Sequence, residues 1–277
     1  ILAMNFDLKR DAFARTLITA HRGVWGGNIP CNTLDAFEVA LAQGADMIEL
    51  DVAHSADGEL FVFHPGMESA HLGSERAIAG MRAEEVRELR FRNYDQTPTQ
   101  ARVNTFDEAL EALKGRCYIN VDKFWENIEP VARAIRRHGM EEQILVKTGP
   151  SEEVFRRIAE VAPDIAYMLI LRDRDEYSDR MLSMPLIYVG AEILFASEDA
   201  PIASREYVES MHQKGLIVWA NAIVYNYRAV LAAGHNDDVS AAGHPDEGWG
   251  WLLDRGYNIL QTDWPGMLRA YMQARNA

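Results

Sequence analysis

The segment Met47-Ile48-Glu49-Leu50-Asp51-Val52 places two carboxylates inside an otherwise apolar run. Such a run is typical of a strand that is covered on both faces, as in a parallel sheet. Successive side chains of a strand point to opposite faces, so Glu49 and Asp51 should share one face. Two carboxylates held together repel each other unless a proton or a cation intervenes, and a hard divalent cation with oxygen ligands is the natural solution.

Short apolar runs of this kind recur along the chain and alternate with helical patterns. The predicted strands are residues 17–20, 47–52, 117–121, 144–146, 165–171, 186–189, 216–220 and 258–261. The predicted helices are residues 34–43, 106–113, 128–138, 152–161, 205–214, 228–233 and 249–255. Repetition of strand and helix predicts a parallel sheet, and eight repeats predict an α/β fold closed into a (β/α)₈ TIM barrel. An open doubly wound sheet is the alternative, which the lack of a glycine-rich dinucleotide motif after the first strand disfavours.

Two connections are longer than the rest. About 60 residues separate the second and third predicted strands, and they begin with Ser55-Ala56-Asp57-Gly58, a hairpin signal that would return His64 beside Asp51. We therefore expect a single domain over residues 1–277, with a small insertion subdomain at about residues 53–114. The second long connection, residues 234–247, is polar and glycine-rich, and it is a candidate lid over the site.

Polar side chains gather at the predicted carboxyl ends of the strands, where barrels carry their reactive residues. Glu49, Asp51 and Asp122 are the expected ligands of one divalent metal ion, Mg²⁺ or Ca²⁺, with Mn²⁺ as a further candidate. The alternative for an isolated Glu-x-Asp pair is a role in capping loops or pairing with arginine.

Two histidines near the same rim suit proton transfer. His21 and His64 could act as the acid–base pair that cleavage of a phosphodiester needs near neutral pH, although a lone buried histidine is more often structural. Arg22 can grip a phosphate with two hydrogen bonds. The expected substrate-binding residues are Lys123, Lys147, Glu192 and Trp219. The plainer interpretations are solvated charges for the lysines and barrel packing for Trp219.

The composition of the chain indicates which binding partners and which cellular compartment to expect. The 277 residues carry 28 basic and 42 acidic side chains, a formal net charge of −14, which disfavours nucleic acid. No run approaches the length of a membrane span, and stable membrane association is not expected. Two cysteines without metal-ligand spacing indicate a reducing compartment, so we expect a cytoplasmic location, or a periplasmic one if an upstream signal was removed. The oligomeric state stays open.

Several motifs together resemble the glycerophosphodiester phosphodiesterase family. The most specific are Ala20-His21-Arg22-Gly23, the stretches 30–37 and 44–52, Asp57-Gly58 and His64. Trp219-Ala220-Asn221 and Gln261-Thr262-Asp263-Trp264-Pro265 are similar to the family's last two strand motifs. The similarity is dense over residues 17–64 and diffuse afterwards.

The resemblance implies a barrel with an insertion after the second strand and a divalent metal ion held by Glu49, Asp51 and an acid on the third strand. It also implies His21 and His64 as the acid–base pair, with Arg22 on the phosphate. The implied reaction is hydrolysis of a small glycerophosphodiester to an alcohol and a phosphomonoester, sn-glycerol 3-phosphate or a sugar phosphate. In the family the substrate's own neighbouring hydroxyl is thought to attack phosphorus, and water then opens the cyclic phosphate.

The chain departs from the family pattern at four places. Cys31 and Pro65 replace a usual Glu and Asp, and Trp264 replaces an Arg. The third strand reads Asn120-Val121-Asp122-Lys123 instead of Glu-x-Lys; we align Asp122 with the Glu, and Asn120 faces the same way if the alignment slips. These departures suggest a subgroup with an unusual leaving group, such as a sugar or opine-type phosphodiester.

Two other functions remain as alternatives. A lipid phosphodiesterase, of the lysophospholipase D or sphingomyelinase D kind, would share the barrel and the histidines, but the sequence offers no basic amphipathic helix or anchor. A non-catalytic phosphodiester-binding relative would explain the changes at Cys31 and Pro65. The retained histidines and paired acids argue against it.

Overall fold

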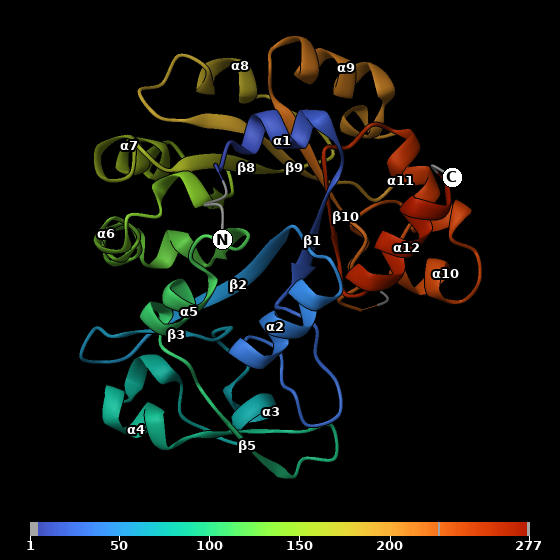
Figure 1. The fold of residues 1–277 in the computed structure, drawn as a ribbon. Coiled ribbons are helices and arrows are strands. Elements are labelled where there is room, and N and C mark those ends of the chain that lie inside the picture. The colour runs from blue at the N-terminus through green and yellow to red at the C-terminus, as the bar shows by residue number, and fades with distance from the viewer. Residues whose placement is uncertain (1–4, 227, 276–277) are drawn as a thin grey trace.

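The computed structural model describes residues 5–226 and 228–275, and within these ranges eight parallel strands close into a barrel (Figure 1). The strands are β1 (Leu17–His21), β2 (Met47–His54), β6 (Tyr118–Asp122), β7 (Ile144–Thr148), β8 (Ala166–Arg172), β9 (Tyr188–Leu194), β10 (Ile217–Asn221) and β11 (Ile259–Thr262). β1 pairs with both β11 and β2, so the ring has no free edge. The predicted (β/α)₈ barrel is therefore confirmed.

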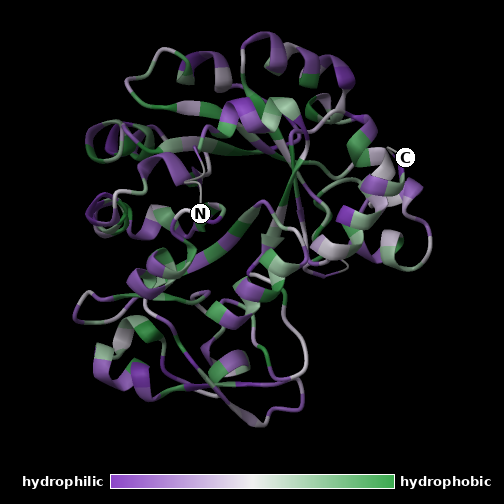
Figure 2. Ribbon diagram, in the orientation of Figure 1, coloured by the Kyte–Doolittle hydropathy of each residue, from purple (hydrophilic) through white to green (hydrophobic). Residues whose placement is uncertain are grey.

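Helices cover the outside of the barrel, and the largest apolar cluster lies between them and the strands. They are α2 (Leu34–Ala42), α5 (Phe106–Leu113), α6 (Ile128–His138), α7 (Glu152–Val161), α8 (Ser178–Met181), α9 (Arg205–Gln213), α10 (Asp237–Ala241), α11 (Trp251–Asp254) and α12 (Pro265–Arg275). Hydrophilic and hydrophobic residues alternate along these helices in Figure 2, as expected for one buried face and one solvated face. None of the described helices is long and apolar enough to cross a membrane.

A second apolar cluster fills the amino-terminal end of the barrel. The short helix α1 (Leu8–Ala14) contributes Leu8 and Ala12, which pack with Met47, Leu145 and Trp219 from the strands. This packing closes one end of the barrel with apolar side chains. The polar residues at the carboxyl ends of the strands consequently face the other end, which is where barrels place their chemistry.

Two predicted elements are wrong in detail. The sixth strand was expected at residues 186–189, but β9 runs from Tyr188 to Leu194 through Gly190. A Cβ atom on Gly190 would lie 1.9 Å from the carbonyl oxygen of Ile217 on β10, so this strand needs a glycine where the sequence pattern indicated an end. The predicted helix at 228–233 is also absent from its described residues, because Phe195 exchanges hydrogen bonds with Leu231 and Ala233 (2.9 Å each).

The residues between β2 and α5 form a layer of their own beside the barrel. They include β3 (Leu60–Val62), α3 (Glu68–Leu72), α4 (Ala83–Glu88), β4 (Arg90–Arg92) and β5 (Pro98–Arg102). This segment holds a third apolar cluster, which includes Phe61, Phe63 and Phe91. β3 runs antiparallel to β2, as the Asp-Gly turn predicts. The helix α5 packs in the main barrel cluster, whereas the third cluster consists of residues that precede it.

The turn after β1 depends on Gly23, which has a φ of +78° and would bring a Cβ atom to 2.7 Å from the backbone of Ala36 on α2. We expect Gly23→Ala to destabilise the fold more than Gly27→Ala, whose φ is +57° but whose Cβ would meet no atom within 4 Å. The left-handed backbone alone costs roughly 1–2 kcal/mol, and the clash at Gly23 adds about 1–3 kcal/mol. Urea unfolding followed by circular dichroism measures both values, and equal losses would contradict this explanation.

Candidate active site

Three carboxylates converge at the carboxyl end of the barrel. Glu49 and Asp51 project from β2, and Asp122 ends β6 directly beside Asp51 in the strand register. One oxygen from each residue lies within 4.8 Å of the other two. Glu49 and Asp51 are buried. Burial, followed by repulsion from Asp51 and Asp122, raises the pKa of Glu49 well above its usual range. Burial and this repulsion both oppose three ionised carboxylates at one place, and a proton or a cation would relieve them.

The donor atoms of this cluster fit a hard divalent cation. Asp51 Oδ2 accepts a hydrogen bond from Asn32 Nδ2 (2.8 Å) and lies 3.0 Å from Arg22 Nε. Its other oxygen, Oδ1, is buried and has no hydrogen-bond partner among the described residues. Asn120 Oδ1 is buried and unpartnered in the same sense, and Asn120 lies opposite Glu49 in the register. A buried oxygen without a donor is costly, and an all-oxygen ligand set suits Mg²⁺ or Ca²⁺.

His21 lies at the end of β1 and is held by Asp263, the residue that directly follows the last strand. Its Nδ1 lies 2.9 Å from Asp263 Oδ1, while the backbone N–H of Asp263 donates to Asp237 Oδ2 (2.8 Å). Because a carboxylate accepts, Nδ1 carries the proton and Nε2 is left free. From the sequence, Asp263 is only part of the motif at residues 261–265 and has no role of its own, and its partner Asp237 on α10 lies inside the candidate lid. Nothing in the sequence pattern indicated this second link.

His64 follows β3, and the backbone fixes its ring. The Nδ1 atom lies 2.9 Å from the carbonyl oxygen of Pro65, which can only accept, so Nδ1 carries the proton and Nε2 is again free. Burial, with the nearby cations Arg22 and Lys123, lowers the pKa of His64, although Asp51 acts in the opposite direction. The neutral ring is therefore favoured, and a neutral imidazole with a free Nε2 can accept a proton.

The expected substrate-binding residues fall into two groups. Lys123, Lys147 and Glu192 line a cavity of about 150 Å³ together with Glu49 and Asp122, which we call the inner cavity. Lys123 Nζ lies 3.2 Å from Asp122 Oδ2, and Lys147 forms an ion pair with Glu192. Trp219 is completely buried, with Lys147 Nζ 3.9 Å above its ring centre. The structure therefore places Trp219 beneath the cavity, as a support for Lys147.

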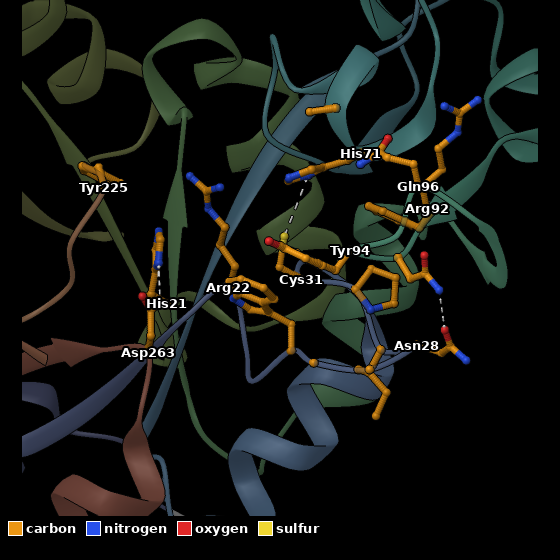
Figure 3. Close-up of a pocket in the computed structure, with 18 of the residues that line it drawn as sticks. His21, Arg22, Asn28, Cys31, His71, Arg92, Tyr94, Gln96, Tyr225 and Asp263 are labelled. Carbon is orange, nitrogen blue, oxygen red and sulfur yellow. Dashed lines mark hydrogen bonds and ion pairs between the residues drawn. The ribbon is translucent and has the colours of Figure 1, made fainter. Parts of the chain in front are cut away.

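A larger cavity of about 450 Å³ opens beside the first, and we call it the outer cavity (Figure 3). Its lining includes His21, Arg22, Trp25, Cys31, His71 and Tyr94. Tyr225 lines both cavities, and its ring meets that of His21 edge to face with centroids 5.8 Å apart. The two cavities thus adjoin at Tyr225, while His21 and Arg22 line the outer one.

Cys31, which stands where the family usually has a glutamate, lies in the wall of the outer cavity. Its Sγ atom is 4.0 Å from His71 Nδ1, and burial raises the pKa of the thiol to about 11. The neutral thiol is a weak nucleophile, because the thiolate is the reactive form. Cys31 therefore contributes a small, uncharged surface where the family pattern would place a carboxylate.

The chain matches known proteins along nearly all of its length. A family model described as the Glycerophosphoryl diester phosphodiesterase family matches residues 21–267. A glycerophosphodiester phosphodiesterase of Caldanaerobacter subterraneus subsp. tengcongensis is 27% identical over 164 residues, which cover 56% of this chain and 67% of that protein. One of Bacillus altitudinis is 34% identical over 131 residues, or 47% of this chain and 51% of that protein.

Solved structures share the fold at low sequence identity. A glycerophosphoryl diester phosphodiesterase from Parabacteroides distasonis superposes with a TM-score of 0.77 at 16% identity, covering 99% of this chain and 94% of that one. A phosphodiesterase from Oleispira antarctica, in complex with the product sn-glycerol-3-phosphate, gives 0.70 at 19% identity, with 95% and 99% covered. At these identities the similarity establishes the barrel fold.

Proposed function

Because the chain belongs to the glycerophosphoryl diester phosphodiesterase family, we propose that it hydrolyses a small glycerophosphodiester with the help of a divalent metal ion and two histidines. The products are an alcohol and a phosphomonoester, sn-glycerol 3-phosphate or a sugar phosphate. One observation carries the proposal: the carboxylates of Glu49, Asp51 and Asp122 converge within 4.8 Å of one another, at the rim that also bears His21.

Glu49, Asp51 and Asp122 are the residues that would hold the metal ion. Once bound, such an ion polarises the phosphate and lowers the pKa of an attacking hydroxyl. Two cationic side chains of the protein add positive charge near the same place: Arg22 lies beside Asp51, and Lys123 lies beside Asp122. They explain how an anionic substrate can bind to a protein with a net charge of −14, since local charge decides binding at short range.

The two imidazoles suit opposite proton transfers. The neutral His64 can take the proton from the attacking hydroxyl at its free Nε2. His21 can protonate the departing alkoxide from its own Nε2, because Asp263 holds the ring through Nδ1 and leaves Nε2 to the substrate. If the neighbouring hydroxyl of the glycerol unit attacks phosphorus, the same two groups exchange roles when water opens the cyclic phosphate.

The test is hydrolysis of glycerophosphocholine and glycerophosphoglycerol, followed by phosphorus NMR, with Mg²⁺, Mn²⁺ or Ca²⁺ supplied one at a time. We expect turnover that stops after chelation with EDTA and returns when the metal is restored. Failure to cleave any phosphodiester with all three metals would contradict the proposal. The comparison of the three metals shows which ion supports the reaction best, and the ligand set leaves that choice open between Mg²⁺ and Ca²⁺.

A further inference from the structure

We propose that the outer cavity binds the leaving alcohol of the substrate, and that it selects a bulky, uncharged, ring-bearing alcohol over glycerol or a quaternary ammonium alcohol. This inference rests on the proposed hydrolase function and specifies its substrate. The two cavities, which share Tyr225, differ in size and in lining. The inner one measures about 150 Å³ and is lined by charged side chains, while the outer one measures about 450 Å³.

The size and position of the outer cavity suit a large group next to the scissile bond. Its volume falls in the range of about 300–1,000 Å³ that is typical of sites for small organic ligands. His21, the group placed to protonate the leaving oxygen, lines this cavity and not the inner one. The leaving alcohol should therefore extend into the outer cavity, while the phosphate stays beside the acid cluster.

Aromatic rings make up much of the wall. Trp25 is 56% exposed, Tyr225 55% and Tyr94 94%, and all three line the same cavity. Exposed large apolar side chains scattered singly need no explanation, but three around one opening indicate a binding site. Such rings offer broad apolar faces on which a ring-bearing group can stack.

The two walls come from distant parts of the chain and are tied together. Trp25, Asn28 and Cys31 belong to the loop after β1, whereas His71 and Tyr94 belong to the insertion (Figure 3). The side chains of Asn93 and Asn28 join the walls through a hydrogen bond of 3.0 Å. The insertion thus builds half of the cavity, and the tie keeps its two halves together.

The charges around the outer cavity do not favour a cation. Among the described residues, Asp263 is the single acid of its lining, and it is already paired with His21. Arg22 lies at the inner edge of the cavity beside Asp51, and Arg92 also lines the cavity. A quaternary ammonium group would meet aromatic faces but no free carboxylate, and it would lie near the Arg22 guanidinium. An uncharged alcohol avoids that repulsion and gains the same apolar contact.

Three esters of sn-glycerol 3-phosphate test the proposal, with benzyl alcohol, choline or glycerol as the second alcohol. With the metal-loaded enzyme, we expect kcat/KM for the benzyl ester to exceed those for the other two by roughly 10-fold or more, which is within the reach of a shaped apolar pocket. Trp25→Ala and Tyr94→Ala should each reduce the benzyl-to-glycerol ratio, the former by about 10-fold. Phe13→Ala is the matched control, because Phe13 is 43% exposed on α1 at the opposite end of the barrel and should leave the ratio unchanged.

The possible outcomes separate this proposal from the hydrolase assignment. A preference for the choline ester, or a benzyl-to-glycerol ratio that neither variant changes, would overturn it while leaving the hydrolase intact. If no ester is cleaved, calorimetric titration of the parent and of Trp25→Ala with the benzyl ester tests whether the outer cavity binds that ester. If the parent binds the benzyl ester and Trp25→Ala does not, the proposed role of the outer cavity stands although the hydrolase function does not. If the parent does not bind the ester, both proposals are overturned.

Discussion

Replacing His21 with alanine should reduce kcat for glycerophosphodiesters by about 10²–10⁴-fold, the usual contribution of a positioned acid or base. Its Nδ1 is held by Asp263 at 2.9 Å, so Nε2 is the atom that serves the reaction. If His21 protonates the leaving oxygen, the loss should shrink for a p-nitrophenyl ester, whose leaving group needs no proton. The parallel variant His64→Ala should lose activity on both kinds of ester.

Steady-state kinetics on the matched glycerol and p-nitrophenyl esters measures this difference. His138→Ala serves as the control, because His138 ends α6 on the outside of the barrel, where its Nε2 lies 2.7 Å from Asp107 Oδ1. Recovery of p-nitrophenyl ester cleavage in His64→Ala instead of His21→Ala would reverse the two roles. Full activity of His21→Ala on both esters would remove His21 from the mechanism.

Replacing Glu49 with glutamine should lower metal-dependent kcat by about three orders of magnitude, and it should stabilise the metal-free protein. The first effect follows because a metal ion supplies several kcal/mol of transition-state stabilisation, and each 1.4 kcal/mol or so is a factor of ten. The second effect concerns the stability of the metal-free protein, which the substitution should increase. Without metal, burial and then repulsion from Asp51 and Asp122 raise the pKa of Glu49, because both oppose its charged form. The neutral amide removes the repulsion.

Thermal unfolding with and without Mg²⁺ or Ca²⁺ measures both parts. A ligand that binds only the folded state raises the melting temperature, so the metal should raise it strongly in the parent and little in Glu49→Gln. Glu209→Gln removes an exposed carboxylate on α9 and should behave as the parent does. An equal shift with metal in all three proteins would place the ion elsewhere, and a lower metal-free melting temperature for Glu49→Gln would contradict the repulsion.

The sequence predicts the barrel well because strands covered on both faces leave continuous apolar runs. Its failures have local causes. Gly190 interrupts the run that continues as β9, and its need for a glycine becomes visible only when β10 lies against it. The short helix α1 was not predicted, since Leu8 and Ala12 become an apolar face only when the barrel end receives them.

The candidate site was predictable where residues follow from strand position. The rule that chemistry lies at the carboxyl ends of strands selected Glu49, Asp51 and Asp122, which the structure brings together. It could not show that Asn32 holds Asp51, since that contact depends on how the loop after β1 folds back. The sequence also could not show that Trp219 is completely buried, because the alternation of side chains along a strand does not give the depth of a ring inside the barrel.

The pairing of His21 with Asp263 spans 242 positions and joins the end of the first strand to the residue that follows the last one. Contacts between residues so distant along the chain form late in folding, because a long loop must close first. A nascent chain still lacking β11 would hold Glu49, Asp51 and Asp122 but would have an unsupported imidazole at position 21. During refolding, catalytic activity should therefore return later than the helical circular dichroism signal. The delay measures how late β11 pairs with β1 and closes the barrel.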